Sequence, residues 1–227
     1  MNVAIDGPGG SGKSVLAKNL ARKLGLVYVD TGALYRTVGL NAYRNGIAKE
    51  DKEGIVESLS SITVTMKYEN GSQRVILSGE DVTELIRTPE ISMYASAVSA
   101  VPEVRQFLNE LQADMVRRGN VVMDGRDIGT VIMPDADVKI FLFASPENRA
   151  QRRYEELIAR GQSVNYEDVL SDIIARDTAD STRETAPAIP ADDAVMLDNS
   201  GFEQEDTYRA AVRIINEKTG ANYDDTL

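Results

Sequence analysis

Short apolar segments alternate with longer amphipathic segments along most of this chain. Four of the five short segments end on an aspartate, and all five have strand-like composition: Val3–Asp6, Val27–Asp30, Val121–Asp124, Val138–Phe143 and Ala194–Asp198. The longer segments predict helices at residues 13–24, 33–45, 51–60, 102–118, 146–160, 166–182 and 203–218. This alternation is typical of an α/β fold, so we expect three layers around a five-stranded parallel sheet.

One segment follows a different period. Apolar and polar residues alternate from Ile62 to Tyr68, Asn70-Gly71 fits a two-residue type I′ turn, and Arg74–Ser78 resumes a strand pattern. A third short strand is expected around Asp81–Leu85. The hairpin interrupts a helix-to-strand connection, which indicates a small inserted antiparallel β subdomain.

Capping residues mark some helix boundaries. Thr88-Pro89 and Ser145-Pro146 each place a capping side chain before a proline suited to the first helical turn. We expect the acidic tail after Gly220 to be frayed.

Composition narrows the class of protein. The 227 residues carry a formal charge of −11 and include no cysteine and no histidine, which excludes thiolate catalysis, imidazole bases and the usual zinc sites. The negative charge argues against nucleic acid as a partner. No apolar run is long enough for a membrane span and no secretory signal fits the N-terminus, so we expect a cytoplasmic protein with no membrane partner. We also expect a monomer.

A glycine-rich loop after the first strand points to a triphosphate ligand. Residues 7–14 read Gly-Pro-Gly-Gly-Ser-Gly-Lys-Ser, the phosphate-binding pattern GxxxxGK[ST] between a strand and a helix. Its glycines let successive N–H groups point at one anion, and the following helix adds the positive end of its dipole. Lys13 reaches the β- and γ-phosphates, and Ser14 can bind Mg²⁺. The expected ATP site comprises Gly7, Pro8, Gly9, Gly10, Ser11, Gly12, Lys13, Ser14 and Val15.

Arginines gather in the second half of the chain. Between Arg126 and Arg183 there are seven arginines and only one lysine, and arginine offers a rigid fork for phosphate oxygens. The loops 30–36 and 124–130 each place an arginine at the carboxyl edge of the sheet, where α/β proteins bind ligands. The second of these loops also fits a plain glycine turn with a local ion pair, but beside a phosphate loop we interpret it as a second anion site.

Two helices add further basic residues. Arg149, Arg153 and Arg160 share one face of the predicted helix 146–160, which fits either a lid over a transferring phosphoryl group or a solvated surface. The spacing of Arg176, Asp180 and Arg183 predicts one shared helix face, and fits either a nucleotide contact or a simple salt bridge.

Taken together, the motifs resemble those of the bacterial cytidylate kinase family. The resemblance runs in order from about residue 2 to 218 and is strongest in the segments 7–14, 30–36, 79–83, 124–130 and 176–183. It implies a P-loop kinase core of residues 1–61 and 101–227, a helical lid at about 145–165, and an inserted monophosphate-binding subdomain at 62–100. It also implies phosphoryl transfer from ATP to CMP and dCMP in pyrimidine nucleotide metabolism, with Mg²⁺ on the ATP phosphates.

The resemblance also implies individual roles. The catalytic residues would be Lys13, Arg126, Arg149, Arg153 and Arg160. The residues around the acceptor would be Thr31, Tyr35, Arg36, Ser96, Arg105, Asp124, Arg126, Asp127, Arg176, Asp180 and Arg183. Of these, Arg36 and Arg126 would hold its phosphate, Ser96, Arg105 and Asp127 its base, and Arg176 and Asp180 its sugar. Thr31 stands where many members have serine, and it keeps the hydroxyl.

The assignment of the base is chemically reasonable. Cytosine presents a 4-amino donor beside two acceptors, so Asp127 can accept while Arg105 donates. Uracil would set an oxygen against the Asp127 carboxylate, and a mismatch of this kind discriminates strongly. We therefore expect UMP to be a much poorer substrate than CMP.

Other classes of P-loop protein fit less well. A GTPase switch needs an Asn-Lys-x-Asp tetrapeptide, which the chain lacks, and Leu77-Ser78-Gly79 only begins like a transport-ATPase signature. The alternatives kept open are another P-loop small-molecule kinase and a non-enzymatic nucleotide switch.

Overall fold

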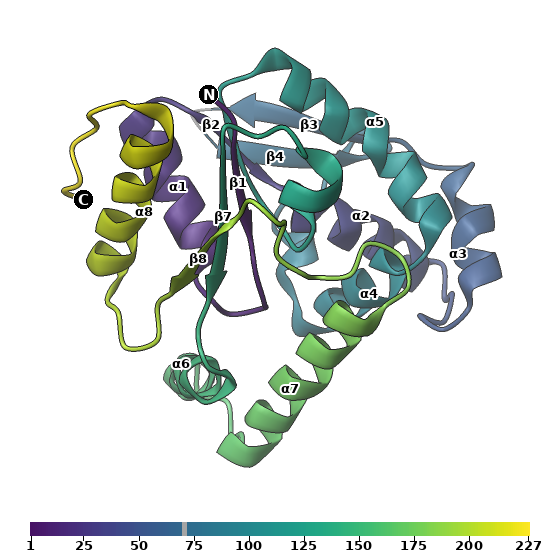
Figure 1. Cartoon of the computed structure of the whole chain (residues 1–227). Coiled ribbons are helices and arrows are strands. Elements are labelled where there is room, and N and C mark those ends of the chain that lie inside the picture. The colour runs from purple at the N-terminus through teal and green to yellow at the C-terminus, as the bar shows by residue number, and fades with distance from the viewer. Residues whose placement is uncertain (70–71) are drawn as a thin grey trace. The chain divides into compact units, whose positions relative to one another are not determined.

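The computed structural model describes residues 1–69 and 72–227 (Figure 1). These residues form two compact units. The first unit consists of residues 1–28 and 119–227, and the second consists of residues 29–118. No helix in the described ranges combines the length and the apolar character needed to cross a lipid bilayer. The Asn70-Gly71 turn expected from the sequence lies outside the described residues.

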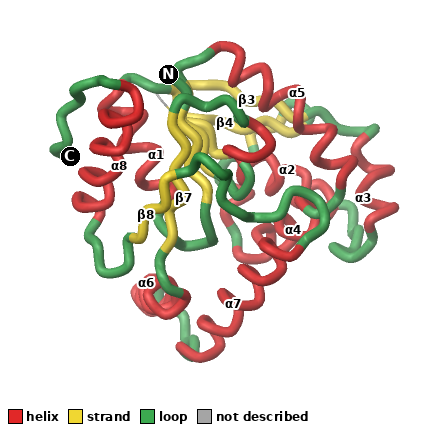
Figure 2. Tube along the Cα trace, in the orientation of Figure 1, coloured by secondary structure: helices red, strands yellow, loops and turns green. Residues whose placement is uncertain are grey.

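The first unit is built around parallel strands (Figure 2). The five-stranded sheet has the order β2-β6-β1-β7-β8. The strands of this sheet are β1 (Val3–Asp6), β2 (Val27–Asp30), β6 (Val121–Asp124), β7 (Val138–Phe143) and β8 (Val195–Asp198). The last two residues of β2, Val29 and Asp30, are counted with the second unit. The register pairs Ile5 with Asp124 and Asp6 with Phe141, so β1 and β6 end close together at one edge, and β7 continues beyond Phe141 to Phe143. The predicted parallel sheet is confirmed, and only β8 begins one residue later than expected.

Helices cover this sheet and extend from its edge. They are α1 (Lys13–Leu24), α6 (Pro146–Ala159), α7 (Tyr166–Thr182), α8 (Gln204–Thr219) and a π-helical turn (Ile128–Ile132). The apolar faces of α1 and α8 pack on the strands in one buried cluster that includes Leu20, Leu142 and Tyr208. A smaller cluster joins α6 to α7.

The C-terminal tail is anchored rather than frayed, which corrects the expectation from the sequence. The Asn216 side chain on α8 donates to the Tyr223 carbonyl at 3.0 Å and accepts from the Tyr223 N–H at 2.8 Å. An ion pair between Arg213 and Asp225 adds a third contact. A side-chain amide of this kind can satisfy the backbone hydrogen-bonding groups of a coil segment. Helical or strand patterns in the sequence do not predict such contacts.

The second unit combines helices with a small antiparallel sheet. Its helices are α2 (Thr31–Arg44), α3 (Lys52–Leu59), α4 (Pro89–Ser99) and α5 (Pro102–Arg118), and its strands are β3 (Val64–Glu69), β4 (Ser72–Leu77) and β5 (Glu80–Asp81). The helices α2 and α4 cross closely at Gly39. A methyl group on Gly39 would lie 2.9 Å from the Tyr94 Cβ. The main core of this unit includes Leu34, Val38, Ile86 and Val98.

The predicted hairpin is confirmed, with Thr65 opposite Ile76 in an antiparallel ladder. The third strand is shorter than expected, because Leu85–Arg87 forms a 3₁₀ turn instead of continuing it. Helix α4 was not among the predicted helices, although its start was marked: Thr88 caps it by accepting from the Ile91 N–H, and Pro89 follows. The segment 62–100 is therefore partly helical; its role as an inserted subdomain stays a prediction.

Candidate functional site

The loop after β1 adopts a conformation that depends on glycine. Gly7 has φ +141°, and a methyl group there would lie only 1.9 Å from the Leu142 carbonyl oxygen. Gly10 and Gly12 also have positive φ, with Gly12 as the N-cap of α1. No acidic residue occupies the first turn of α1, so the positive end of that helix is not neutralised there. The backbone around Gly10 and Gly12 is therefore shaped to present N–H groups to an anion.

Lys13 folds back over this loop. Its Nζ donates to the Pro8 carbonyl at 2.6 Å and to the Ser11 Oγ at 3.3 Å, and the residue is only 5% exposed. Burial, followed by the nearby Arg126 guanidinium, holds the pKa of Lys13 well below its ordinary value. An anion on the loop would offset both effects, since it favours the charged ammonium form.

Three arginines approach the same loop at Gly9. Arg149 of α6 donates from Nη1 to the Gly9 carbonyl at 3.0 Å and is itself buried. A methyl group on Gly9 would lie 3.3 Å from Nη2 of Arg126 and 3.8 Å from Nη1 of Arg176. Arg149 also forms an ion pair with Asp177 of α7, at 2.5 Å. One lysine and three arginines thus converge on one loop, a geometry suited to a polyphosphate.

Ser14 and Asp124 form a second polar group beside the loop. The Ser14 hydroxyl donates to Oδ2 of Asp124 at 2.7 Å, and the Tyr28 hydroxyl donates to Oδ1 at 2.9 Å. The sequence interpretation placed Asp124 among the acceptor residues, whereas the structure shows it bonded to the Ser14 hydroxyl. Both supply hard oxygen atoms of the kind that Mg²⁺ prefers.

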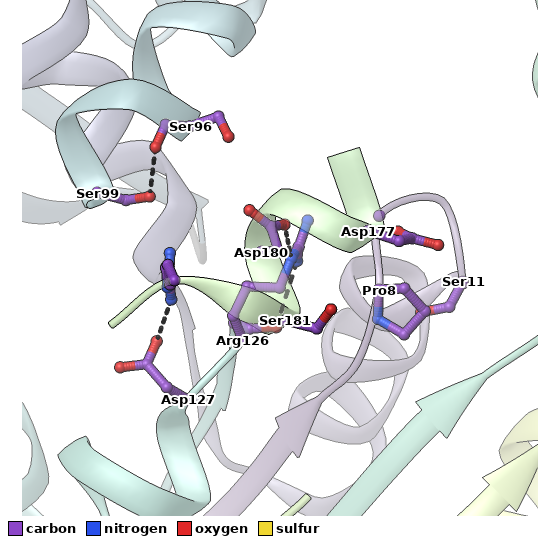
Figure 3. Close-up of polar contacts among 12 residues, drawn as sticks. Pro8, Ser11, Ser96, Ser99, Arg126, Asp127, Asp177, Asp180 and Ser181 are labelled. Carbon is purple, nitrogen blue, oxygen red and sulfur yellow. Dashed lines mark hydrogen bonds and ion pairs between the residues drawn. The ribbon is translucent and has the colours of Figure 1, made fainter. Parts of the chain in front are cut away.

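The loop after β6 and the end of α7 are joined by two ion pairs. Arg126 contacts Asp180 at 2.9 Å (Figure 3), and Arg183 contacts Asp127 at 3.5 Å. Arg183 is the C-cap of α7 and has extended backbone, so the expected helix face shared by Arg176, Asp180 and Arg183 does not form as predicted. The reason is that α7 ends at Thr182, where Arg183 turns away and donates to the Ala186 carbonyl at 2.7 Å.

The other arginines of α6 lie elsewhere. Arg153 and Arg160 both pair with Glu156, at 2.8 Å and 2.5 Å, on an exposed surface of the helix. Arg152 donates to the Asn199 carbonyl at 3.0 Å. Of the predicted lid residues, Arg149 alone has a contact with the phosphate loop among those described, and the roles of Arg153 and Arg160 stay predictions.

The remaining predicted residues belong to the second unit. Thr31 and Tyr35 are buried in α2, and Arg36 faces Asp30 at 3.8 Å. Arg105 of α5 is also buried, donates to the Ser99 carbonyl at 2.9 Å, and has its guanidinium carbon 5.5 Å from the centre of the Tyr35 ring. Ser96 lies one turn before Ser99 on α4, where its carbonyl accepts from the Ser99 hydroxyl.

Asp30 organises the start of α2. It caps the helix by accepting from the Ala33 N–H at 3.0 Å and pairs with Arg87 at 2.7 Å. Its backbone N–H donates to the Gln73 side chain on β4 at 2.8 Å. The Arg36 and Arg87 guanidinium groups hold the pKa of this buried carboxyl below its ordinary value, although burial alone would raise it.

A cavity of about 280 Å³ adjoins the phosphate loop. It is lined on one side by Gly10, Gly12 and Val15, and on the other by residues 199–207 before and within α8. Asn199 is buried and donates to the Ser11 carbonyl at 2.9 Å, so it ties this wall to the loop. The sequence interpretation missed Asn199, because nothing in the local pattern links it to a loop 188 residues away.

These features define a class. A parallel α/β sheet with a glycine loop, a buried lysine and clustered arginines at one edge is a P-loop protein of the kind that binds and transfers phosphates.

Comparisons with known proteins place the chain within this class. The family model "Cytidylate kinase" matches residues 3–217. Cytidylate kinase of Carboxydothermus hydrogenoformans is 47% identical over 96% of this chain and 98% of its own length. Cytidylate kinase of Pelotomaculum thermopropionicum is 49% identical over 93% and 94%, and that of Caldicellulosiruptor bescii 47% identical over 94% and 95%. The chain belongs to the cytidylate kinase family. Its activity is cytidylate kinase activity, that of a nucleoside monophosphate kinase which uses ATP.

Proposed function

We propose that the protein transfers the γ-phosphoryl group of ATP to the α-phosphate of CMP or dCMP, which yields ADP and CDP or dCDP. The observation that carries the proposal is the convergence of one lysine and three arginines on the loop at Pro8 and Gly9. Such transfer needs positioning and charge neutralisation more than a base, so the absence of histidine is no obstacle.

The donor nucleotide is assigned to the loop of residues 7–15 and the adjoining cavity. The backbone N–H groups and Lys13 would hold the phosphates, and the cavity between Gly12 and residues 199–207 is open to the nucleoside. The low pKa of Lys13 supports this assignment, because a bound polyphosphate would stabilise its charged form.

Magnesium is assigned to the Ser14 hydroxyl, with Asp124 supporting it. The 2.7 Å bond between the two places a carboxylate beside the expected ligand. When bound, the ion would neutralise negative charge on the ATP phosphates. Tyr28 would keep Asp124 oriented through its own 2.9 Å hydrogen bond.

The acceptor is assigned to the residues that the family resemblance implies. Arg36 and Arg126 would hold its phosphate together with Tyr35 and Thr31. Arg105, Ser96 and Asp127 would read its base, and Arg176, Asp180 and Arg183 would lie at its sugar. The ion pairs within this set support the proposal, since each buried carboxylate is paired with a partly buried guanidinium group that limits its movement: Asp180 with Arg126 and Asp127 with Arg183.

The test is an assay of ADP release across a panel of acceptors. CMP and dCMP should be turned over well, and UMP, AMP, shikimate and sugar acids much more slowly. Equal efficiency with UMP and CMP would contradict the role of Asp127 at the base. Preference for a hydroxyl acceptor such as shikimate would instead support the alternative of another small-molecule kinase.

A further inference from the structure

Asp6 has no role in the mechanism proposed above. It lies between the phosphate loop (residues 7–14) and the loop of residues 124–130 after β6, which is called the acceptor loop below. It is the last residue of β1 and is 4% exposed. The direction of the chain after it is fixed, because only glycine fits at position 7 against the Leu142 carbonyl. A buried carboxylate at such a place needs hydrogen-bond partners.

The partners of Asp6 are two successive peptide groups of the acceptor loop. Its Oδ1 accepts from the Ile128 N–H and its Oδ2 from the Gly129 N–H, both at 2.7 Å. These peptide groups directly follow Asp127. The fit leaves little room, because a methyl group on Gly129 would lie 3.3 Å from Oδ2 of Asp6 and 3.2 Å from Cδ of Lys139.

Asp127 begins the turn that these bonds hold. Its carbonyl accepts from the Val131 N–H at 2.9 Å, and its own backbone has φ −144° and ψ 28°. The direction of the Asp127 side chain is therefore set by the peptide plane that follows it. That peptide plane carries the Ile128 N–H, which Asp6 binds.

We infer that Asp6 is a positioning residue for base selectivity: it fixes the backbone after Asp127 and so aims the Asp127 carboxylate at the base of the acceptor. The inference rests on the proposed function, in which Asp127 reads that base. In this inference the end of β1 fixes two loops: the phosphate loop, which follows Asp6 in the chain, and the acceptor loop, whose backbone Asp6 binds.

Electrostatics agree with this geometry. Burial and the nearby Asp127 raise the pKa of Asp6 to about 6, while the two backbone bonds and Lys13 act in the opposite direction. At neutral pH the group is therefore mainly a carboxylate, and both of its oxygen atoms are pure acceptors. In a low-dielectric site, a backbone N–H group forms a stronger hydrogen bond with a carboxylate than with a neutral acceptor.

The test uses Asp6→Asn and compares two acceptors. Asparagine keeps the shape, but its NH₂ group would oppose one of the two backbone N–H donors, so that peptide must move. We expect kcat/KM for CMP to fall about tenfold and the CMP/UMP ratio of kcat/KM to fall by about as much, since small misplacements in a site are costly. The ratio is the decisive quantity, because any indirect effect of Asp6 on Lys13 is common to both acceptors.

Three further variants complete the design. Asp127→Asn should lower the CMP/UMP ratio by itself. If Asp6 acts through Asp127, the double variant should have a ratio no lower than that of Asp127→Asn, because effects on one shared contact are not additive. Asp198→Asn is the matched control: Asp198 also ends a strand of the sheet and accepts a backbone N–H, from Ser200, but it is far in sequence from the acceptor loop. Its ratio should equal that of the wild type.

The outcomes separate the inference from the proposed function. A lowered ratio in Asp127→Asn with an unchanged ratio in Asp6→Asn overturns the inference alone. An unchanged ratio in Asp127→Asn overturns the role of Asp127 and the inference with it. If Asp6→Asn does not fold, Gly129→Ala disturbs the same contact from the other side and should lower the ratio in the same direction; an unchanged ratio there also overturns the inference.

Discussion

The buried carboxyl of Asp6 should make stability depend on pH in a specific way. Its pKa is raised from 3.8 to about 6 in the folded protein, chiefly by burial. The folded state therefore binds a proton more tightly than the unfolded state between these two values. Stability from this group is fully present below about pH 4 and is lost as the pH rises through about 6. Asparagine at the same position does not titrate and removes this dependence.

The magnitude follows from the shift. A difference of about two pKa units at about 1.4 kcal/mol per unit gives about 3 kcal/mol at neutral pH. Because the unfolded group is already partly ionised at pH 4.5, about 2 kcal/mol of this change falls between pH 4.5 and 7.5. Relative to the wild type, Asp6→Asn should therefore gain about 2 kcal/mol in free energy of unfolding between these two pH values. The hydrogen bond that the variant loses is common to both conditions.

Urea unfolding of the wild type and Asp6→Asn at the two pH values measures this difference. Asp198→Asn is a useful control, because hydrogen bonds from Ser200 hold the pKa of the exposed Asp198 below its ordinary value. Stability from Asp198 is present above its ordinary pKa and is lost only as the pH falls below that value, so Asp198→Asn should show almost no change relative to the wild type between the two pH values. The reasoning would be refuted if the free energy of unfolding of Asp6→Asn relative to the wild type stayed constant between the two pH values, or fell toward neutral pH.

Three other substitutions test the proposed site. Lys13→Ala should lower kcat by about a hundredfold to a thousandfold with an unchanged circular dichroism spectrum, and near-normal turnover would remove Lys13 from the mechanism. Asp124→Asn should raise the magnesium concentration for half-maximal rate about tenfold in a titration at saturating ATP; an unaltered requirement would show that Asp124 does not support Ser14. Arg183→Ala should raise KM for CMP about tenfold while KM for ATP changes less than twofold, and unchanged CMP kinetics would leave Arg183 with a structural role in its contacts with Asp127 and the Ala186 carbonyl.

Most of the fold is visible in local patterns. Buried parallel strands are short apolar runs, and here each of β1, β2, β6 and β8 ends on an aspartate at the carboxyl edge. Helix α4 escaped prediction because its residues 89–99 mix small, polar and apolar side chains without a clear stripe. Its stability comes from packing against α2 at Gly39, which is a tertiary effect that local propensity does not contain.

The site was predictable in its residue types more than in its contacts. Arg149, Arg153 and Arg160 share a helix face, but a shared face does not fix the distance along the axis. At 1.5 Å per residue, Arg160 lies about 16 Å further along than Arg149, which alone of the three has a described contact with the Gly9 carbonyl. Likewise, Ser14 and Asp124 are 110 residues apart in the sequence. They come together only because β1 and β6 are neighbouring strands in the sheet.

The formal charge of −11 and the cationic loop are compatible because they act over different ranges. The charge of the whole chain repels an extended polyanion, whereas beyond a Debye length of about 8 Å a small nucleotide is screened from most of it. In the complex proposed above, the nucleotide would meet at the loop a buried lysine whose pKa is depressed by burial and by Arg126. The ligand's negative charge would stabilise the charged ammonium form of Lys13, and that stabilisation would contribute to the binding free energy.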